Sequence, residues 1–172
     1  MPCVQGLAAF DVDGVLADVA HRRHHLDRRN WDAFFAAAAD DPPLATGVTM
    51  ARQCAAAGLS VVYVSGRPER LRRVTADWLD RHGLPPGELL LRPDRDRSPN
   101  TRLKLRLLRS LARRGTLVTF VDDDAWVVDA VRAARPPLVS GQVFLADWQT
   151  SEPDGAELRG PLRHAQQVEG RT

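Results

Sequence analysis

The chain has 172 residues, of which 44% are hydrophobic and 27% are charged, and its formal net charge is +2. These values predict one globular domain that is long enough to enclose its own core. So small a net charge is no argument for nucleic-acid binding by itself. No apolar run reaches the length of a membrane-spanning helix, and the N-terminus lacks the basic and apolar regions of a secretory signal. We therefore expect a cytoplasmic protein with no membrane partner.

Two residue types are scarce enough to be informative. Cys3 and Cys54 have no metal-binding spacing, so reduced thiols are the simplest interpretation. Nearly all the basic residues are arginines, and Lys104 is the only lysine in the chain. A lysine ammonium is a compact charge that an arginine does not imitate, so we expect Lys104 to have a functional role.

Strand patterns and helix patterns alternate along the chain. The predicted strands are residues 7–10, 59–64, 88–91, 116–121 and 139–145. The predicted helices are residues 31–39, 46–57, 68–82, 101–114 and 125–134. Asn30 and Asp124 are the expected N-caps of the first and last helices, Gly58 ends the second, and Pro68 is expected in the first turn of the third. This alternation predicts an α/β fold with a mostly parallel central sheet flanked by helices.

The domain is expected to cover residues 1–149, with a small helical insert at about 18–45. Within the insert, residues 21–29 read as a polar, basic connector. Residues 150–172 are polar and poor in core-forming side chains, so we expect a tail with little regular structure.

The stretch Phe10-Asp11-Val12-Asp13-Gly14-Val15-Leu16 directly follows the first predicted strand. Asp11 and Asp13 lie two residues apart, so in an extended chain both carboxylates address the same space. One carboxylate can attack an electrophile while the other passes a proton, with a cation cancelling their repulsion. A solvated turn or a calcium loop is the alternative. Val15 and Leu16 exclude an EF-hand, because they stand where it needs a ligand and a glycine.

Other strand ends deliver polar residues to the same edge of the predicted sheet. Ser65 follows the second strand, Asp122 and Asp123 follow the fourth, and Lys104 lies on the helix before it. This set suits phosphoryl transfer to an aspartate, with Asp11 as nucleophile, Asp13 as acid and base, and Ser65 and Lys104 on the phosphate. We expect Mg²⁺ as the cofactor, held by the acidic residues Asp11, Asp13, Asp122 and Asp123.

These residues lie in four ordered motifs, at 10–16, 62–67, Lys104 and 120–123, which resemble those of the haloacid dehalogenase (HAD) superfamily. The resemblance spans residues 7 to about 145. It implies a three-layer Rossmannoid HAD fold, and the short insert after the first motif suggests little or no cap domain. An aspartate at position 13 resembles the phosphatases and phosphomutases of the superfamily rather than its dehalogenases.

Within the superfamily, residues 64–70 and 121–128 are similar to the 3′-phosphatase domains of bacteriophage polynucleotide kinase-phosphatases. This resemblance implies removal of a 3′-phosphate from a nucleic acid end or a nucleotide, as in nucleic acid repair. It also implies that Arg22, Gly66 and Arg67 bind the substrate. The P-loop pattern of the kinase half, G-x-x-x-x-G-K-[ST], is absent from this sequence, so no kinase activity is expected.

Several alternatives remain open at this stage. A small-metabolite phosphatase would use the same machinery, and a binding module with a decayed site would keep only part of it. A phosphoacceptor receiver module has similar residues in a different chain order. His21 and His25 have zinc-like spacing but no third ligand. The arginines of 21–29 and 92–106 fit either a phosphate backbone or solvated loops, and the four tryptophans fit core or rim packing.

Overall fold

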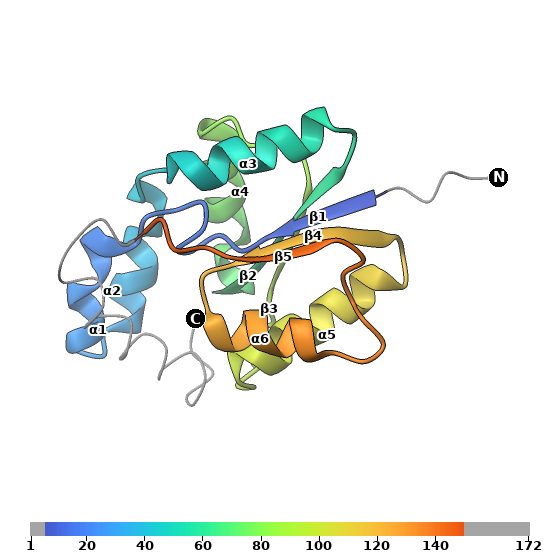
Figure 1. Cartoon of the computed structure of the whole chain (residues 1–172). Coiled ribbons are helices and arrows are strands. Elements are labelled where there is room, and N and C mark those ends of the chain that lie inside the picture. Colours follow the sequence, from blue (N-terminus) through green and yellow to red (C-terminus); the bar gives the residue numbers. More distant parts are fainter. Residues whose placement is uncertain (1–5, 150–172) are drawn as a thin grey trace.

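A single parallel sheet organises the molecule, and the computed structural model describes residues 6–149 of it. The strand order is β3-β2-β1-β4-β5, and every neighbouring pair is parallel (Figure 1). The strands are β1 (Gly6–Phe10), β2 (Ser60–Pro68), β3 (Glu88–Arg92), β4 (Thr116–Asp122) and β5 (Gln142–Leu145). The α/β class predicted from the sequence is therefore confirmed.

Helices cover both faces of the sheet, giving three layers (Figure 1). The long helices are α3 (Ala45–Ala56), α4 (Arg72–Arg81), α5 (Asn100–Ala112) and α6 (Ala125–Ala133). Along β1 the side chains alternate, because successive residues of a strand face opposite sides. Ala8 and Phe10 pack with α3 and α4, whereas Ala9 packs with α5 and α6. None of the helices in the described part is long and apolar enough to cross a membrane.

Four short helical segments follow β1 and lie beyond the ends of the strands in Figure 1. They are η1 (Ala20–Arg22), α1 (His24–Asp27), α2 (Trp31–Ala36) and η2 (Ala37–Asp40). Asn30 caps α2 as predicted, since its side chain accepts a hydrogen bond from the backbone N–H of Ala33 at 3.1 Å. These segments place the insert beside the carboxyl ends of the strands, where α/β folds carry their sites.

The prediction that Pro68 begins a helix is wrong. Strand β2 continues through Pro68, which pairs with Arg92 of β3, and a short 3₁₀ turn, η3 (Glu69–Leu71), separates it from α4. The fixed φ of proline is as compatible with extended backbone as with a helix, and a missing N–H is tolerated at the end of a strand. The extension carries Arg67 into the strand, with its side chain fully buried.

The remaining predicted boundaries need smaller corrections. The last strand is shorter than predicted and begins at Gln142 rather than at residue 139. Gly58 has a left-handed φ of 84°, as expected of the glycine that ends α3. Asp124 caps α6 as predicted, accepting a hydrogen bond from the backbone N–H of Trp126 at 2.9 Å. The predicted tail at 150–172 lies outside the described residues.

Candidate active site

The centre of the site is Lys104, a fully buried lysine between two carboxylates. Its Nζ lies 2.9 Å from Asp11 Oδ1 and 2.9 Å from Asp122 Oδ2, and it donates to the backbone oxygen of Val64 at 2.7 Å. Neighbouring strands explain the meeting: β1 pairs with β4, so Asp11 and Asp122 leave the sheet side by side. Burial acts to lower the pKa of Lys104, but the two carboxylates outweigh it and raise that pKa.

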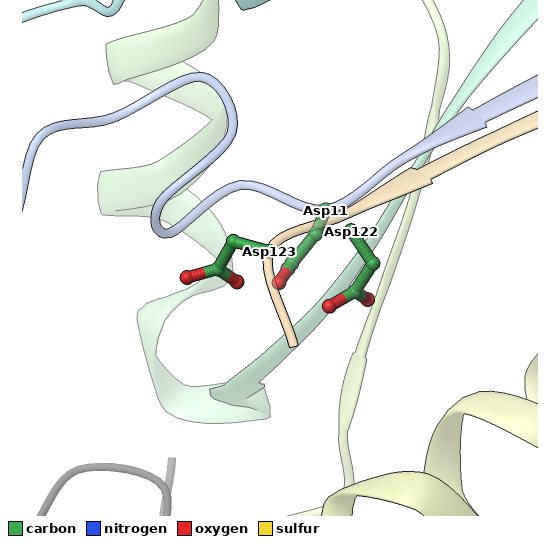
Figure 2. A group of neighbouring side chains, drawn as sticks. All are labelled: Asp11, Asp122 and Asp123. Atoms are coloured by element: carbon green, nitrogen blue, oxygen red, sulfur yellow. The ribbon is translucent and has the colours of Figure 1, made fainter. Parts of the chain in front are cut away.

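Asp11, Asp122 and Asp123 form the acidic group of the site. Oxygen atoms from the three carboxylates all lie within 4.8 Å of one another, and Figure 2 shows the side chains gathered at the ends of β1 and β4. Burial and the neighbouring acids raise the pKa of Asp11 to about 7, although Lys104 opposes the shift. Burial first, and then the neighbouring aspartates, also raise the pKa of Asp123 well above its usual value. A hard divalent cation with oxygen ligands would relieve this repulsion, so the three residues fit Mg²⁺.

Gly14 leaves the space that Asp123 occupies. Its φ is +80°, and a Cβ at this position would lie 2.2 Å from Asp123 Oδ2. The glycine thus meets two demands, a left-handed turn and close approach of the Asp123 carboxylate. The backbone N–H of Asp124 donates to Asp122 Oδ1 at 3.0 Å and fixes the second carboxylate.

Asp13 points to a different set of partners. Its Oδ1 accepts hydrogen bonds from Arg22 Nη2 at 2.9 Å and from Arg67 Nη2 at 2.6 Å and Nε at 3.0 Å. Burial acts to raise the pKa of Asp13, but the charges of Arg67 and Arg22 outweigh it and hold that pKa below its usual value. The structure therefore brings Asp13, predicted among the magnesium ligands, onto two arginines, whereas Asp11, Asp122 and Asp123 share the acidic group.

Asp41 is a site residue that the sequence did not reveal. Its carboxylate accepts from Arg22 Nε and Nη2 and from Arg67 Nη2, each at 2.7 Å, and lies 2.7 Å from His21 Nε2. Its side chain is fully buried, and its backbone oxygen accepts from Trp78 Nε1 at 2.8 Å. In the sequence, Asp41 precedes two prolines and reads as the stop of a helix, so nothing there marked it as a partner of arginines.

The basic connector at 21–29 is not simply a solvated loop. Arg22 is fully buried and Arg23 is 6% exposed, contrary to the interpretation of the run as solvated. The Arg22 guanidinium lies over the ring of Phe34, 4.2 Å from its centroid, and donates to the Phe34 backbone oxygen at 3.3 Å. An amphipathic arginine packs in this way when carboxylates and a ring surround its head group. The histidines there do not join the acidic group.

Ser65 and Gly66 are buried residues in the second half of β2, which continues past them to Pro68. Ser65 is 1% exposed, and its Oγ accepts a hydrogen bond from the backbone N–H of Arg67 at 3.1 Å. The backbone oxygen of Gly66 accepts from Arg92 Nε at 3.3 Å. Since β2 is the neighbour of β1 on the side away from β4, Ser65 and Gly66 lie on one side of Asp11, and Asp122, at the end of β4, lies on the other.

Comparisons with known proteins identify the family of the chain and solved structures with a similar fold. The model of the family described as "Polynucleotide kinase PNKP phosphatase domain" matches residues 7–147. A search of curated proteins found no match to this sequence.

Among solved structures, the fold is similar to chains in two structures of the Pnkp1/Rnl/Hen1 complex, one of them titled as an RNA repair complex. These have 21% and 20% identity and TM-scores of 0.67 and 0.69; both alignments cover 84% of this chain, and 47% and 43% of those chains. The present chain thus spans less than half of their length. A class C acid phosphatase from Bacillus anthracis with tungstate bound has 15% identity, a TM-score of 0.60 and coverage of 92% of this chain and 78% of that one.

Proposed function

We propose that this chain, which belongs to the family of polynucleotide kinase PNKP phosphatase domains and is a HAD-type phosphatase, removes 3′-phosphates from nucleic acid ends. The reaction would depend on Mg²⁺ and proceed through an aspartyl-phosphate. The observation that carries the chemistry is the buried Lys104 between Asp11 and Asp122, at an edge of the sheet that also holds Asp123. The three carboxylates favour the binding of a divalent cation, and that cation together with Lys104 would favour the binding of a phosphate.

In this proposal Asp11 is the nucleophile. Its carboxylate oxygen forms a bond to phosphorus while the bond from phosphorus to the 3′-oxygen breaks, and the 3′-oxygen leaves with a proton from Asp13. The oxygen of a water molecule then bonds to phosphorus while the bond to the Asp11 oxygen breaks, Asp13 takes a proton from that water, and free phosphate departs from the regenerated Asp11 carboxylate. Lys104 holds Asp11 in place and presents a positive charge to the transferring group. Mg²⁺, held by Asp11, Asp122 and Asp123, would neutralise the charge on the phosphate oxygens.

Asp13 is proposed as the acid and base rather than as a side-chain ligand of the cation. The contacts from Arg22 and Arg67 fix its carboxylate, and its lowered pKa keeps it ionised near neutral pH. An ionised Asp13 is ready for the step that activates water, whereas the leaving step requires that it first take up a proton. Ser65 and the backbone at Gly66 would contact the phosphate from the β2 side. Arg22 and Arg67, which Asp41 holds in place, would add positive charge near the phosphate.

Polynucleotide ends are the proposed substrates because the family is that of a polynucleotide phosphatase domain and the insert between β1 and α3 contains only short helical segments. An insert of this size leaves a polymer end room to approach. The proposed partner is therefore a nucleic acid with a 3′-phosphate, and the proposed setting is nucleic acid repair. The location in the cytoplasm remains a prediction from the sequence.

A matched set of substrates tests this proposal. Phosphate release with Mg²⁺ would be measured for a 3′-phosphorylated oligonucleotide, its 5′-phosphorylated isomer, a 3′-mononucleotide and several sugar phosphates. The proposal expects the 3′-phosphorylated oligonucleotide to give the highest kcat/KM, with little release from its isomer. A higher kcat/KM for a sugar phosphate would support the phosphatase chemistry but would show that the preferred substrate is a small metabolite.

A further inference from the structure

A pocket of about 350 Å³ lies beside the active site, and the reaction described above does not use it. Its walls come from the start of α2, the end of β2 and the loop that follows β3. The residues that matter for its chemistry are Arg29, Trp31, Phe35, Arg70, Arg92 and Arg97. This combination of aromatic rings and guanidinium groups defines what we call the arginine–aromatic pocket.

The aromatic wall belongs to one helix. Trp31 and Phe35 are one turn apart on α2, with ring centroids 6.0 Å apart and an interplanar angle of 34°. The indole Nε1 of Trp31 is buried, and among the described residues it has no hydrogen-bond partner. A buried N–H without an acceptor destabilises the protein, and an acceptor on a bound molecule would relieve this. Flat rings with an unused donor suit a heteroaromatic base.

The charge of the pocket is positive. Four arginines line it and two aspartates, Asp32 and Asp94, oppose them. Arg70 uses both acids, at 3.6 Å from Asp94 and 3.9 Å from Asp32, and its guanidinium lies 5.4 Å from the Phe35 ring centroid. Neither Arg29 nor Arg97 forms an ion pair within the described part of the chain. Both are exposed at the pocket, where a phosphate diester could meet them.

The pocket shares structural elements with the active site. Pro68 lines the pocket and directly follows Arg67, which contacts Asp13. Arg92 lines it too and donates to the backbone oxygen of Gly66. On α2, Phe34 packs beneath Arg22, while Trp31 and Phe35 form the aromatic wall. A substrate held at Asp11 would therefore extend into this pocket from the β2 side.

We propose that the arginine–aromatic pocket binds the terminal nucleoside of the substrate together with the phosphate on its 5′ side. The base stacks against Trp31 and Phe35, and the 5′-side phosphate is held by Arg97 and Arg29. This inference rests on the proposed function. It adds that the enzyme recognises the second phosphate of a polynucleotide end and not only the one it removes.

Nucleotides that differ by one phosphate test this directly. The ratio of kcat/KM for a nucleoside 3′,5′-bisphosphate to that for the nucleoside 3′-phosphate measures recognition of the 5′-side phosphate. Because it compares two substrates of one enzyme, the ratio does not change when a variant only reduces the fraction of active protein. We expect about a tenfold ratio or more for the native chain, reduced severalfold in Arg97→Gln. Arg113→Gln, at an exposed arginine that ends α5, is the matched control and should keep the native ratio.

A second variant tests the aromatic wall. Trp31→Leu should lower kcat/KM for both nucleotides about tenfold or more, while hydrolysis of glycerol phosphate, which has no base, stays native and shows that the fold is intact. The pocket assignment would be overturned if the native chain gave a kcat/KM ratio near one. It would also be overturned if both variants kept the native ratio and the native kcat/KM for the nucleotides. Either result would leave the 3′-phosphatase proposal standing. Absence of release from every phosphate ester would overturn both.

Discussion

Asp13 and Asp41 share one pair of arginines, since Arg22 and Arg67 each donate hydrogen bonds to both carboxylates. All four charged groups lie in or at the edge of the core, and three of them are fully buried at the side chain. Two cations and two anions at this depth stabilise one another only while all four are present. Asp41 therefore fixes the position of Asp13 without being a group that touches the substrate.

Removal of the charge at Asp41 should affect both stability and turnover. Asp41→Asn keeps the shape but leaves two buried guanidinium groups with Asp13 as their shared carboxylate, so we expect about 3 kcal/mol of lost stability. That corresponds to a fall in Tm of roughly 10 °C for a chain of this size. We also expect kcat to fall more than KM changes. Asp40→Asn, at the exposed neighbour, is the control and should match the native chain in both measurements.

Lys104 should be essential for turnover because it neutralises two buried carboxylates. Lys104→Met is expected to lower kcat by about 10² or more, the usual cost of losing one group that stabilises a transition state. Without the ammonium, Asp11 and Asp122 repel each other, so added Mg²⁺ should raise the Tm of the variant by more than that of the native chain. Lys104→Arg should not restore activity, since a guanidinium does not fit the space of a fully buried lysine. Native turnover in Lys104→Met would remove Lys104 from the mechanism, whereas native turnover in Lys104→Arg would show that any cation at this position is sufficient.

Alanine substitutions at two glycines with similar backbone angles distinguish the effect of backbone strain from an effect on metal binding. Gly14 and Gly58 have φ values of 80° and 84°, but a Cβ would meet Asp123 at Gly14 and open space at Gly58. Alanine at either position should cost roughly 1–2 kcal/mol of stability. Only Gly14→Ala should raise the Mg²⁺ concentration needed for half-maximal activity, because it displaces Asp123. An equal magnesium requirement in the two variants would contradict the assignment of Asp123 as a ligand.

The loss of folding stability at low pH should depend in part on Asp96. Partial burial acts to raise its pKa, but the hydrogen bond from the backbone N–H of Ser98 and the ion pair with Arg106 lower it to about 2. Because the folded pKa lies below the unfolded value of about 3.9, the stabilisation is present above pH 4 and is lost as the pH falls through 2. We expect Asp96→Asn to be less stable than the native chain at pH 7, by about 1 kcal/mol or less. Thermal unfolding at a series of pH values should show this difference closing between pH 4 and pH 2.

Strand ends account for the part of the site that the sequence could predict. Asp11, Ser65 and Asp122 each follow an apolar run, which is β-branched before Ser65 and Asp122. The parallel order of a sheet brings the ends of such runs together. Lys104 stood out because no other lysine competes with it. Helix periodicity and capping residues such as Asn30 and Asp124 located the helices to within a few residues. These signals are local, so one sequence is enough to read them.

The arginine network could not be predicted, because it depends on how the insert folds back over the sheet. Arg22 lies in a run of basic residues that resembles a solvated loop, and its burial follows only when Phe34 and Asp41 pack around it. The extension of β2 through Pro68 likewise depends on pairing with β3, which overrides the local preference of proline for the start of a helix. Such long-range contacts leave no pattern at a fixed spacing.

The most direct test of the mechanism is phosphate release from a 3′-phosphorylated oligonucleotide by the native chain and by Asp11→Asn, each with Mg²⁺ and with a chelator. We predict release by the native chain that requires Mg²⁺, and a fall in kcat of at least about 10⁴ in the variant, as expected when a nucleophile is removed. The Tm of the variant, measured in parallel, establishes that it is folded. Turnover by a folded Asp11→Asn chain within tenfold of the native value would contradict the assignment of Asp11 as the nucleophile.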